Sequence, residues 1–396
     1  MQDWEHTKPI SVPEGGRLIV LQAGPTTLGQ SMGYLKGNGS DVIVYDIGAG
    51  GACDPSNKRF DGFSENYAAM LSGDDIDYRI NAFQLDPEKD YLVFAVGKST
   101  TSMREITRSF FALQYWGWDL ERLAFLNGSV SYDFAPSSGL SSYLTAAPAN
   151  AAGMPEQKNE YHMYTMKKDR TSIIAYTKEM MQAIGKKKSF IVDARGTAEY
   201  DGTKKSKSVT KRCGPNHDQQ CYTAYRGHIK GAVDLPYTDI LVLDDQREDI
   251  NGDGNIDEAD ASFKFKSPQE LKKLFKEKGY KKGQMVYAYC RTGRKATLVT
   301  MATMTALGYP TKLYDASWIN WGSMAYVTDN TGESIFPQDS KWRTDITKYV
   351  DLVGYNDPSE VESQSIFNFN FEADDTDAIK QADKEYLQQA LAQQEQ

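Results

Sequence analysis

The stretch Met285–Ala296, which reads MVYAYCRTGRKA, decides the fold and the chemistry of this chain. Its first five residues form an apolar run bounded by polar residues, which is typical of a buried strand. A helix pattern follows from about Ala296 to Leu307, and Gly308 ends it. Cys290 therefore lies where a strand ends and shortly before a helix begins.

The loop around this cysteine is strongly cationic. After Cys290 it comprises Arg291, Thr292, Gly293, Arg294 and Lys295. Backbone N–H groups of a tight loop and of a helix N-terminus favour an anion at this place, and three cationic side chains favour the thiolate further. A small cysteine packed at a strand end is the alternative interpretation, but it leaves the three charges without compensation. We predict that Cys290 is a nucleophile and that the five loop residues bind an anionic substrate.

Strands and helices alternate on both sides of this stretch. Short β-branched or apolar runs predict strands at 17–22, 41–47, 91–96, 123–126, 189–193 and 311–314. Helix patterns stand at 103–116, 176–184 and 268–278. The last of these begins with a capping box, because Ser267 is followed by Pro268 and, three residues on, by Glu270. The alternation predicts an α/β chain with mostly parallel sheets flanked by helices.

The two halves of the chain correspond to each other. The run that ends at Gly97 aligns with the run that ends at Cys290, which indicates a diverged internal duplication with no nucleophile in the first copy. Prolines and small residues over 146–159 indicate an interdomain linker. We expect a non-catalytic domain at 1–150, a linker at 151–168, a catalytic domain at 169–355 and an acidic C-terminal arm at 356–396.

Further motifs surround the Cys290 loop in a specific order. They are IVDAR at 191–195, GHIKGAV at 227–233 and YDASWINWG at 314–322. Over about residues 170 to 325 this order resembles the rhodanese sulfurtransferases, and the last motif is similar to that of their tandem-domain thiosulfate and mercaptopyruvate members. In the first half the resemblance rests mainly on topology. It implies two rhodanese-like domains.

The resemblance implies a sulfur transfer in two steps. Cys290 attacks the outer sulfur of an inorganic sulfur anion such as thiosulfate, and the resulting persulfide passes its sulfur to cyanide or a thiol. The loop cations would hold the sulfonate, with Arg195 as a further anion contact. Asp193, His228 and Trp318 are expected to be structural residues near the site. The cationic loop, together with Glu199 where mercaptopyruvate enzymes tend to carry arginine, favours thiosulfate over mercaptopyruvate.

Other functions remain as alternatives. The protein could be a sulfur carrier without catalytic turnover, in which a partner protein forms the persulfide on Cys290. A calcium-dependent interaction module is a third class of function. Dual-specificity phosphatases also place a cysteine on such a loop, but they need arginine at the position of Ala296. No organic cofactor is expected.

A calcium-binding motif interrupts the second half. Residues 249–260 match the twelve-residue EF-hand loop, with a glycine at its sixth position. The predicted ligands are Asp249, Asn251, Asp253, Asn255 through its carbonyl, Asp257 and Asp260. Asp260 replaces the usual glutamate, as in dockerin-type loops. We expect a structural calcium ion, with an acidic turn as the alternative.

Charge and cysteine content restrict partners and location. The chain has 396 residues and a net charge of −9, which argues against general binding to nucleic acid, and it has no run suited to a transmembrane helix. Cys213 and Cys221 are expected to form a small disulfide, with two free thiols as the alternative. A disulfide and a lone calcium site fit a periplasmic or extracellular protein without its leader, whereas the observed start favours the cytoplasm.

Overall fold

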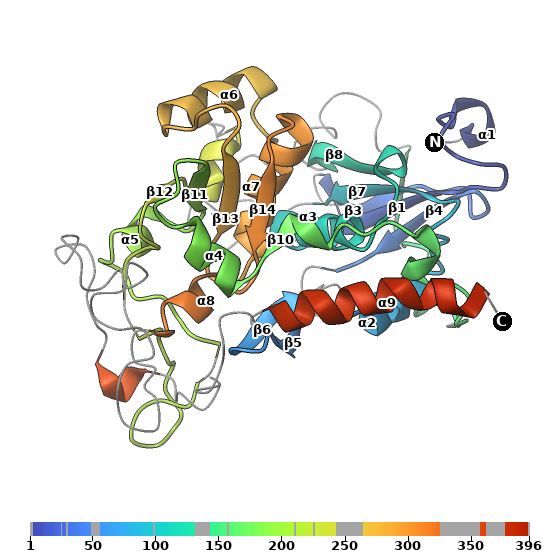
Figure 1. Ribbon diagram of the computed structural model, residues 1–396. Coiled ribbons are helices and arrows are strands. Elements are labelled where there is room, and N and C mark those ends of the chain that lie inside the picture. Colours follow the sequence, from blue (N-terminus) through green and yellow to red (C-terminus); the bar gives the residue numbers. More distant parts are fainter. Residues whose placement is uncertain are drawn as a thin grey trace.

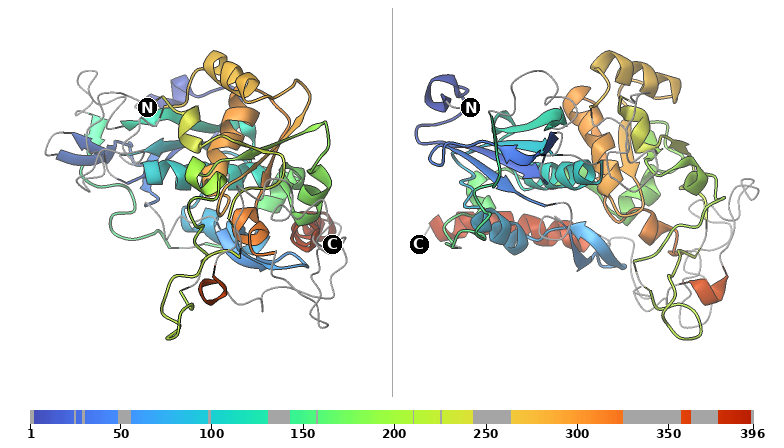
Figure 2. Two further views of the ribbon diagram at one scale, coloured as in Figure 1. Left: turned by 90° about the vertical axis from the view of Figure 1, so that its left-hand side faces the viewer. Right: turned by 180° about the vertical axis from the view of Figure 1, so that it is seen from behind.

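The computed structural model describes residues 3–24, 26–28, 31–48, 56–97, 100–130, 143–156, 158–209, 211–224, 226–242, 264–324, 357–361 and 377–394. Two parallel sheets dominate these residues, and Figure 1 shows helices packed around each sheet. The predicted α/β fold with parallel sheets is therefore confirmed. Figure 2 shows the two sheets from two further sides, with helices between them.

The first sheet has four parallel strands. In sheet order they are β4 (Val42–Asp46), β1 (Leu18–Ala23), β7 (Tyr91–Val96) and β8 (Leu123–Ser129). Every residue of β1 is buried, as expected for a central parallel strand covered on both faces. The predicted strands are found at these places, and β8 extends three residues beyond the predicted end at 126.

The second sheet has five parallel strands. In sheet order they are β10 (Ile174–Ala175), β14 (Thr311–Tyr314), β13 (Met285–Tyr289), β11 (Ser189–Asp193) and β12 (Ala232–Asp234). The order β12-β11-β13-β14 repeats the order β4-β1-β7-β8 of the first sheet. β13 and β7 thus hold equivalent positions, as the predicted duplication requires.

Alternation of side chains along β13 decides which helices cover each face of the second sheet. Val286 and Ala288 belong to the core under α6 (Pro268–Glu277) and α7 (Arg294–Thr300). Tyr287 and Tyr289 belong to the opposite core under α4 (Thr177–Ala183) and α8 (Ser317–Trp321). The short α5 (Thr197–Tyr200) follows β11.

The capping box at α6 is present as predicted. The Ser267 hydroxyl accepts a hydrogen bond from the Glu270 backbone N–H, and the Glu270 carboxylate accepts one from the Ser267 N–H. α7 begins at Arg294, two residues before the predicted start. A π-helix, Met301–Ala306, directly continues α7.

α3 (Thr100–Tyr115) connects the two halves of the molecule. It follows β7 in the first domain and packs against α7 of the second, and Figure 1 shows it between the two sheets. Its Thr107 hydroxyl lies 3.0 Å from the Thr297 hydroxyl of α7. This helix therefore brings the first domain to the elements that carry the Cys290 loop.

Antiparallel elements and two further helices complete the first domain. They are α1 (Trp4–Thr7), β2 (Thr26–Leu28), β3 (Ser31–Leu35), β9 (Leu144–Thr145), β5 (Ser56–Phe60), β6 (Glu65–Met70) and α2 (Gly73–Ala82). The hairpin of β5 and β6 was not among the predicted strands, because its sequence is largely polar. Within the predicted linker, Met163 is fully buried and the His162 ring lies 2.7 Å from a carboxylate oxygen of Asp77.

The C-terminal arm contains a packed helix, α9 (Ala378–Gln394), which lies beside α2 in Figure 1. The Arg59 guanidinium and the Asp383 carboxylate form an ion pair of 2.6 Å between β5 and α9. The Lys380 amine lies 3.8 Å from the Glu179 carboxylate of α4. α9 thus contacts both domains, which the acidic composition of the predicted arm did not indicate.

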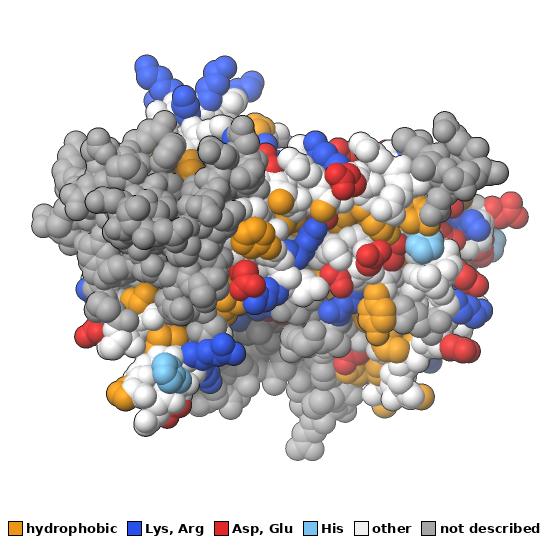
Figure 3. Space-filling model, turned by 60° about the horizontal axis from the view of Figure 1, so that its bottom comes forward, with side chains coloured by type: hydrophobic (Ala, Val, Ile, Leu, Met, Phe, Trp, Pro, Cys, Tyr) orange, Lys and Arg blue, Asp and Glu red, His pale blue; other side chains and the backbone are white. Residues whose placement is uncertain are grey.

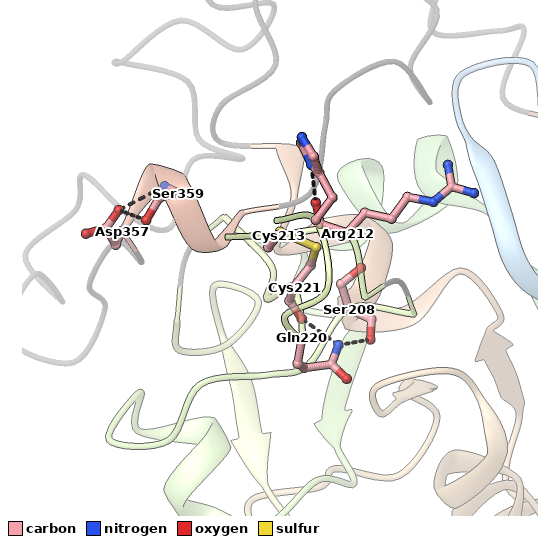
Figure 4. Close-up of a disulfide and its surroundings, with 8 residues drawn as sticks. Ser208, Arg212, Cys213, Gln220, Cys221, Asp357 and Ser359 are labelled. Atoms are coloured by element: carbon pink, nitrogen blue, oxygen red, sulfur yellow. Dashed lines mark hydrogen bonds between the residues drawn. A yellow bond between two sulfur atoms is a disulfide. The ribbon is translucent and has the colours of Figure 1, made fainter. Parts of the chain in front are cut away.

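Cys213 and Cys221 form a disulfide, which confirms that expectation (Figure 4). The predicted calcium loop, residues 249–260, lies outside the described residues. No helix in the described part of the chain is long and apolar enough to cross a membrane. On the face that Figure 3 shows, acidic, basic and hydrophobic side chains are interspersed.

Candidate active site around Cys290

Cys290 directly follows β13 and is almost completely buried, with 1% of its surface exposed. Its backbone is held by the start of α8. The Trp318 N–H donates to the Cys290 carbonyl at 2.9 Å, and the Cys290 N–H donates to the Ser317 hydroxyl at 3.3 Å. The backbone of Cys290 is therefore held at a fixed place with almost no exposed surface.

Ser317 itself has an unusual backbone conformation, with φ of 56°. Residues other than glycine are uncommon in this region, and they cluster at places where the surrounding structure fixes the chain. Besides accepting from Cys290, the Ser317 hydroxyl donates to the Tyr314 carbonyl at 2.8 Å. Ser317 is thus a positioning residue that the sequence indicated only as part of a longer motif.

Gly293 makes the turn between the cysteine and α7. Its φ of 82° is left-handed, which favours glycine. A Cβ atom at this place would lie 3.0 Å from Nη1 of Arg108 and 3.2 Å from Oδ1 of Asp315. The loop therefore needs glycine both for its backbone angle and for close contact with an ion pair behind it.

The three cations of the loop have contacts to three different elements. Arg291 donates to the Lys207 carbonyl at 3.0 Å, and the Arg294 Nε lies 3.3 Å from Glu105 Oε2. The Lys295 amine lies 4.8 Å from the centre of the Tyr237 ring. Burial lowers the pKa of Arg294 below its usual value. That these side chains, with Thr292 and Gly293, bind an anion stays a prediction.

Arg195 and Asp193 form a buried ion pair next to the loop. Arg195 Nη2 lies 2.5 Å from Asp193 Oδ2, and Nε lies 2.9 Å from Oδ1. The guanidinium also donates to the Ser206 hydroxyl and the Gly227 carbonyl, and it stacks 4.2 Å above the Trp318 ring. The Arg195 guanidinium thus donates its hydrogen bonds to groups of the protein. Its role as a contact for the substrate anion stays a prediction.

Asp193 also supports β13 directly, because it accepts a hydrogen bond of 2.8 Å from the Tyr289 hydroxyl. Tyr289 directly precedes Cys290, and its hydroxyl oxygen accepts from the Ile229 N–H at 3.0 Å. This arrangement agrees with the expected structural role of Asp193 below the loop. Since the carboxylate is paired with Arg195, it brings no uncompensated negative charge to the thiol.

His228 has the contacts of a structural residue. Its ring stacks on the Tyr200 ring with centroids 3.9 Å apart, and Nδ1 lies 2.8 Å from the Tyr200 carbonyl. Burial lowers the pKa of His228 below its usual value and so favours the neutral imidazole.

The segment that carries the disulfide is connected to the site by hydrogen bonds (Figure 4 shows the disulfide itself). The Ser208 N–H donates to the Cys221 carbonyl, and the Thr223 N–H donates to the Ser206 carbonyl, so two short segments pair beside it. The Thr223 hydroxyl accepts from the Trp318 indole at 3.2 Å. The segment that carries the disulfide is thereby connected to the residues around Cys290.

Residues from the first domain complete the site, and sequence reasoning missed them. Arg108 of α3 forms an ion pair of 2.6 Å with Asp315, and Glu105 of the same helix contacts Arg294. The local pattern held no clear signal, because α3 mixes these charges with other polar residues, and its sequence alone does not distinguish a buried charge from a solvated one.

Comparisons with known proteins agree with this geometry. Residues 176–324 match the family model of the rhodanese-like domain. A Mycolicibacterium smegmatis protein named "Putative thiosulfate sulfurtransferase" is 31% identical over 182 residues, which are 46% of this chain and 54% of the relative. The "Sulfur carrier protein TtuD" of Thermus thermophilus is 31% identical over 167 residues, 41% of this chain and 49% of that protein. The chain thus spans about half the length of these curated relatives.

Similarity to solved structures extends further along the chain. The structure titled "Crystal structure of YnjE" matches with a TM-score of 0.51 and 14% identity, over 81% of this chain and 64% of the other. At this identity the match shows the fold alone. It reaches beyond the residues that the family model matches.

Proposed function

We propose that this protein is a sulfurtransferase that moves sulfane sulfur from thiosulfate, or a similar inorganic sulfur anion, to cyanide or a thiol. One observation carries the proposal: Cys290 ends β13 on a cationic turn, within the residues that match the rhodanese-like domain. Two buried ion pairs, Asp193–Arg195 and Arg108–Asp315, hold the surroundings of this turn in place.

The proposed chemistry needs a nucleophile and anion stabilisation. The Cys290 thiolate attacks the outer sulfur of thiosulfate, the sulfur–sulfur bond of the donor breaks, and sulfite leaves with its electron pair. The acceptor then attacks the outer sulfur of the persulfide, and the thiolate returns as leaving group. No general base is required, because each leaving group is already an anion. Arg291, Arg294 and Lys295 would stabilise the negative charge of donor and sulfite.

Intact-mass measurement tests this proposal. Wild type treated with thiosulfate should gain one sulfur atom per chain, which cyanide should remove as thiocyanate, and Cys290→Ser should gain none. Repeated turnover in the same sample would show that the protein is an enzyme. An equal gain by Cys290→Ser would show that the nucleophile has been assigned wrongly.

A sulfur carrier without turnover is the second candidate, and the similarity to the Thermus thermophilus carrier favours it. Such a protein would take up sulfur from a persulfidated partner and pass it on once. Failure to react with thiosulfate, combined with loading by polysulfide or by a persulfidated protein, would favour the carrier over the enzyme.

A calcium site at residues 249–260 is part of the proposal as a structural element. Its support is the pattern of oxygen ligands in the sequence. Calcium should raise the unfolding temperature of wild type, and Asp249→Ala together with Asp253→Ala should abolish this increase. A sulfur-transfer assay would rule out a calcium-dependent interaction module if Cys290→Ser lost the transfer while removal of calcium left it intact.

An oxidising compartment is the proposed location, because the protein contains a disulfide. Trapping thiols in the source cells before lysis tests the proposal. Cys213 and Cys221 should resist alkylation until a reductant is added, whereas their full alkylation without reductant would favour the cytoplasm.

A further inference from the structure

Arg294, one of the cations of the Cys290 loop, is held by side chains from the first domain. Its Nε lies 3.3 Å from Oε2 of Glu105 on α3, and its Nη2 donates to the Ser56 hydroxyl of β5 at 3.5 Å. The side chain of Glu105 is 10% exposed, and that of Arg294 is 29% exposed. The Glu105 carboxylate of the first domain is therefore paired with Arg294, a cation of the Cys290 loop.

The environment of Glu105 makes this contact replaceable. Within the described residues, no hydrogen bond reaches Glu105 Oε2, so the pair is held by charge. Burial raises the pKa of Glu105, and the charges of Arg104 and Arg108 oppose this effect. Arg108 is held by Asp315 and the Ala68 carbonyl, to which it donates. Glu105 forms its ion pair across to the second domain with Arg294.

We propose that Glu105 is a positioning residue that sets the affinity of the site for oxyanions. In the resting protein it holds Arg294, and the oxyanion end of the sulfur donor takes its place on the guanidinium. After the sulfur–sulfur bond breaks, the carboxylate returns and helps to displace sulfite. This inference rests on the proposed function and gives the first domain a role in donor binding and product release.

The physical reason is competition for one cation. A guanidinium that already faces a carboxylate binds a second anion less tightly, because the energy of the resting pair is lost when the second anion enters. Removal of the Glu105 charge should therefore tighten the binding of every oxyanion that uses Arg294, whether or not it carries transferable sulfur. An unreactive oxyanion is for this reason the best probe.

Sulfate protection of Cys290 tests the proposal. The probe is inorganic sulfate, and the readout is the rate at which neutral iodoacetamide alkylates the Cys290 peptide, measured by mass spectrometry. Glu105→Gln should lower the sulfate concentration for half protection by about two- to fivefold. In the Arg294→Gln background the same substitution should have no effect, because the cation for which both anions compete is absent.

Glu179→Gln is the matched control. Glu179 is also a partly buried carboxylate, paired with Lys312 at 2.5 Å, but it belongs to α4 and contacts the middle of the second sheet. This variant should leave sulfate protection unchanged. The proposal is overturned if Glu105→Gln leaves protection unchanged or weakens it, or if its effect persists in the Arg294→Gln background.

Steady-state kinetics with thiosulfate provide the second readout. Glu105→Gln should lower KM by about two- to fivefold without raising kcat, and sulfite should become a stronger product inhibitor by the same factor. Tighter sulfate protection without any persulfide from thiosulfate would contradict the proposed function but keep the role of Glu105. If thiosulfate forms the persulfide but Glu105→Gln leaves sulfate protection unchanged, the proposed function stands and the role of Glu105 is contradicted.

Discussion

Arg108 and Asp315 form a fully buried ion pair that joins the two domains behind the Cys290 loop. Arg108 Nη1 lies 2.6 Å from Asp315 Oδ1, and neither side chain is exposed. Asp315 Oδ2 accepts from the Met70 N–H, and Arg108 Nη2 donates to the Ala68 carbonyl, both from β6. Since a Cβ atom at position 293 would lie 3.0 Å from Arg108 and 3.2 Å from Asp315, the pair leaves room there for glycine alone, and the first domain thus borders the Cys290 loop from behind.

Loss of Arg108 should destabilise the protein strongly. Arg108→Met leaves the Asp315 carboxylate buried and unpaired, and we expect the free energy of unfolding to fall by about 3–5 kcal/mol. Urea denaturation measures this change. The double variant Arg108→Met with Asp315→Leu should recover part of the loss, because it leaves no unpaired charge. A loss below about 1 kcal/mol in Arg108→Met would contradict the importance of the pair.

Gly293→Ala should impair the loop more than a matched glycine substitution elsewhere. It places a Cβ 3.0 Å from Arg108 Nη1 in a left-handed conformation, at an expected cost of about 1–3 kcal/mol. Single-turnover persulfide formation should also become slower. Gly279→Ala is the control, because φ there is 98° but nothing lies within 4 Å of the added atom. It should lower stability without slowing the reaction.

Removal of the disulfide should affect both stability and the site. Cys213 and Cys221 are eight residues apart, and the chain-entropy model for such a short loop predicts a loss of about 2–3 kcal/mol in Cys213→Ser with Cys221→Ser. Because the paired segments contact Trp318 and Arg291, persulfide formation should also become slower. Unchanged kinetics in this variant would show that the paired segments at 206–208 and 221–223 keep their positions without the disulfide.

Sulfate affinity should depend on pH through Glu105. Burial raises its pKa, so the carboxyl becomes neutral at a higher pH than an exposed glutamate, and a neutral Glu105 no longer competes for Arg294. The charged groups that face it are Arg104, Arg108 and Arg294. Sulfate protection of wild type should therefore tighten as the pH falls through the folded pKa of Glu105, and Glu105→Gln should remain flat. Parallel curves would contradict this mechanism.

Much of the second domain follows from local patterns in the sequence. The apolar run before Cys290, the capping box at Ser267 and the spacing of Cys213 and Cys221 predicted a strand, a helix start and a disulfide that the structure contains. Such features depend on neighbours within a few residues, and so the sequence by itself is enough to predict them.

Only the tertiary structure decided what surrounds the loop. Arg108 and Asp315 are 207 residues apart, and Arg59 and Asp383 are 324 apart. Each charge has the same local appearance as a solvated one, and only the packing of α3 on α7 and of α9 on β5 shows that it is buried and paired. The sequence thus determined the strand before Cys290 and the cationic turn after it. The contact between the domains decided which charges reach them, because burial of an ion pair requires both partners to be brought together from distant parts of the chain.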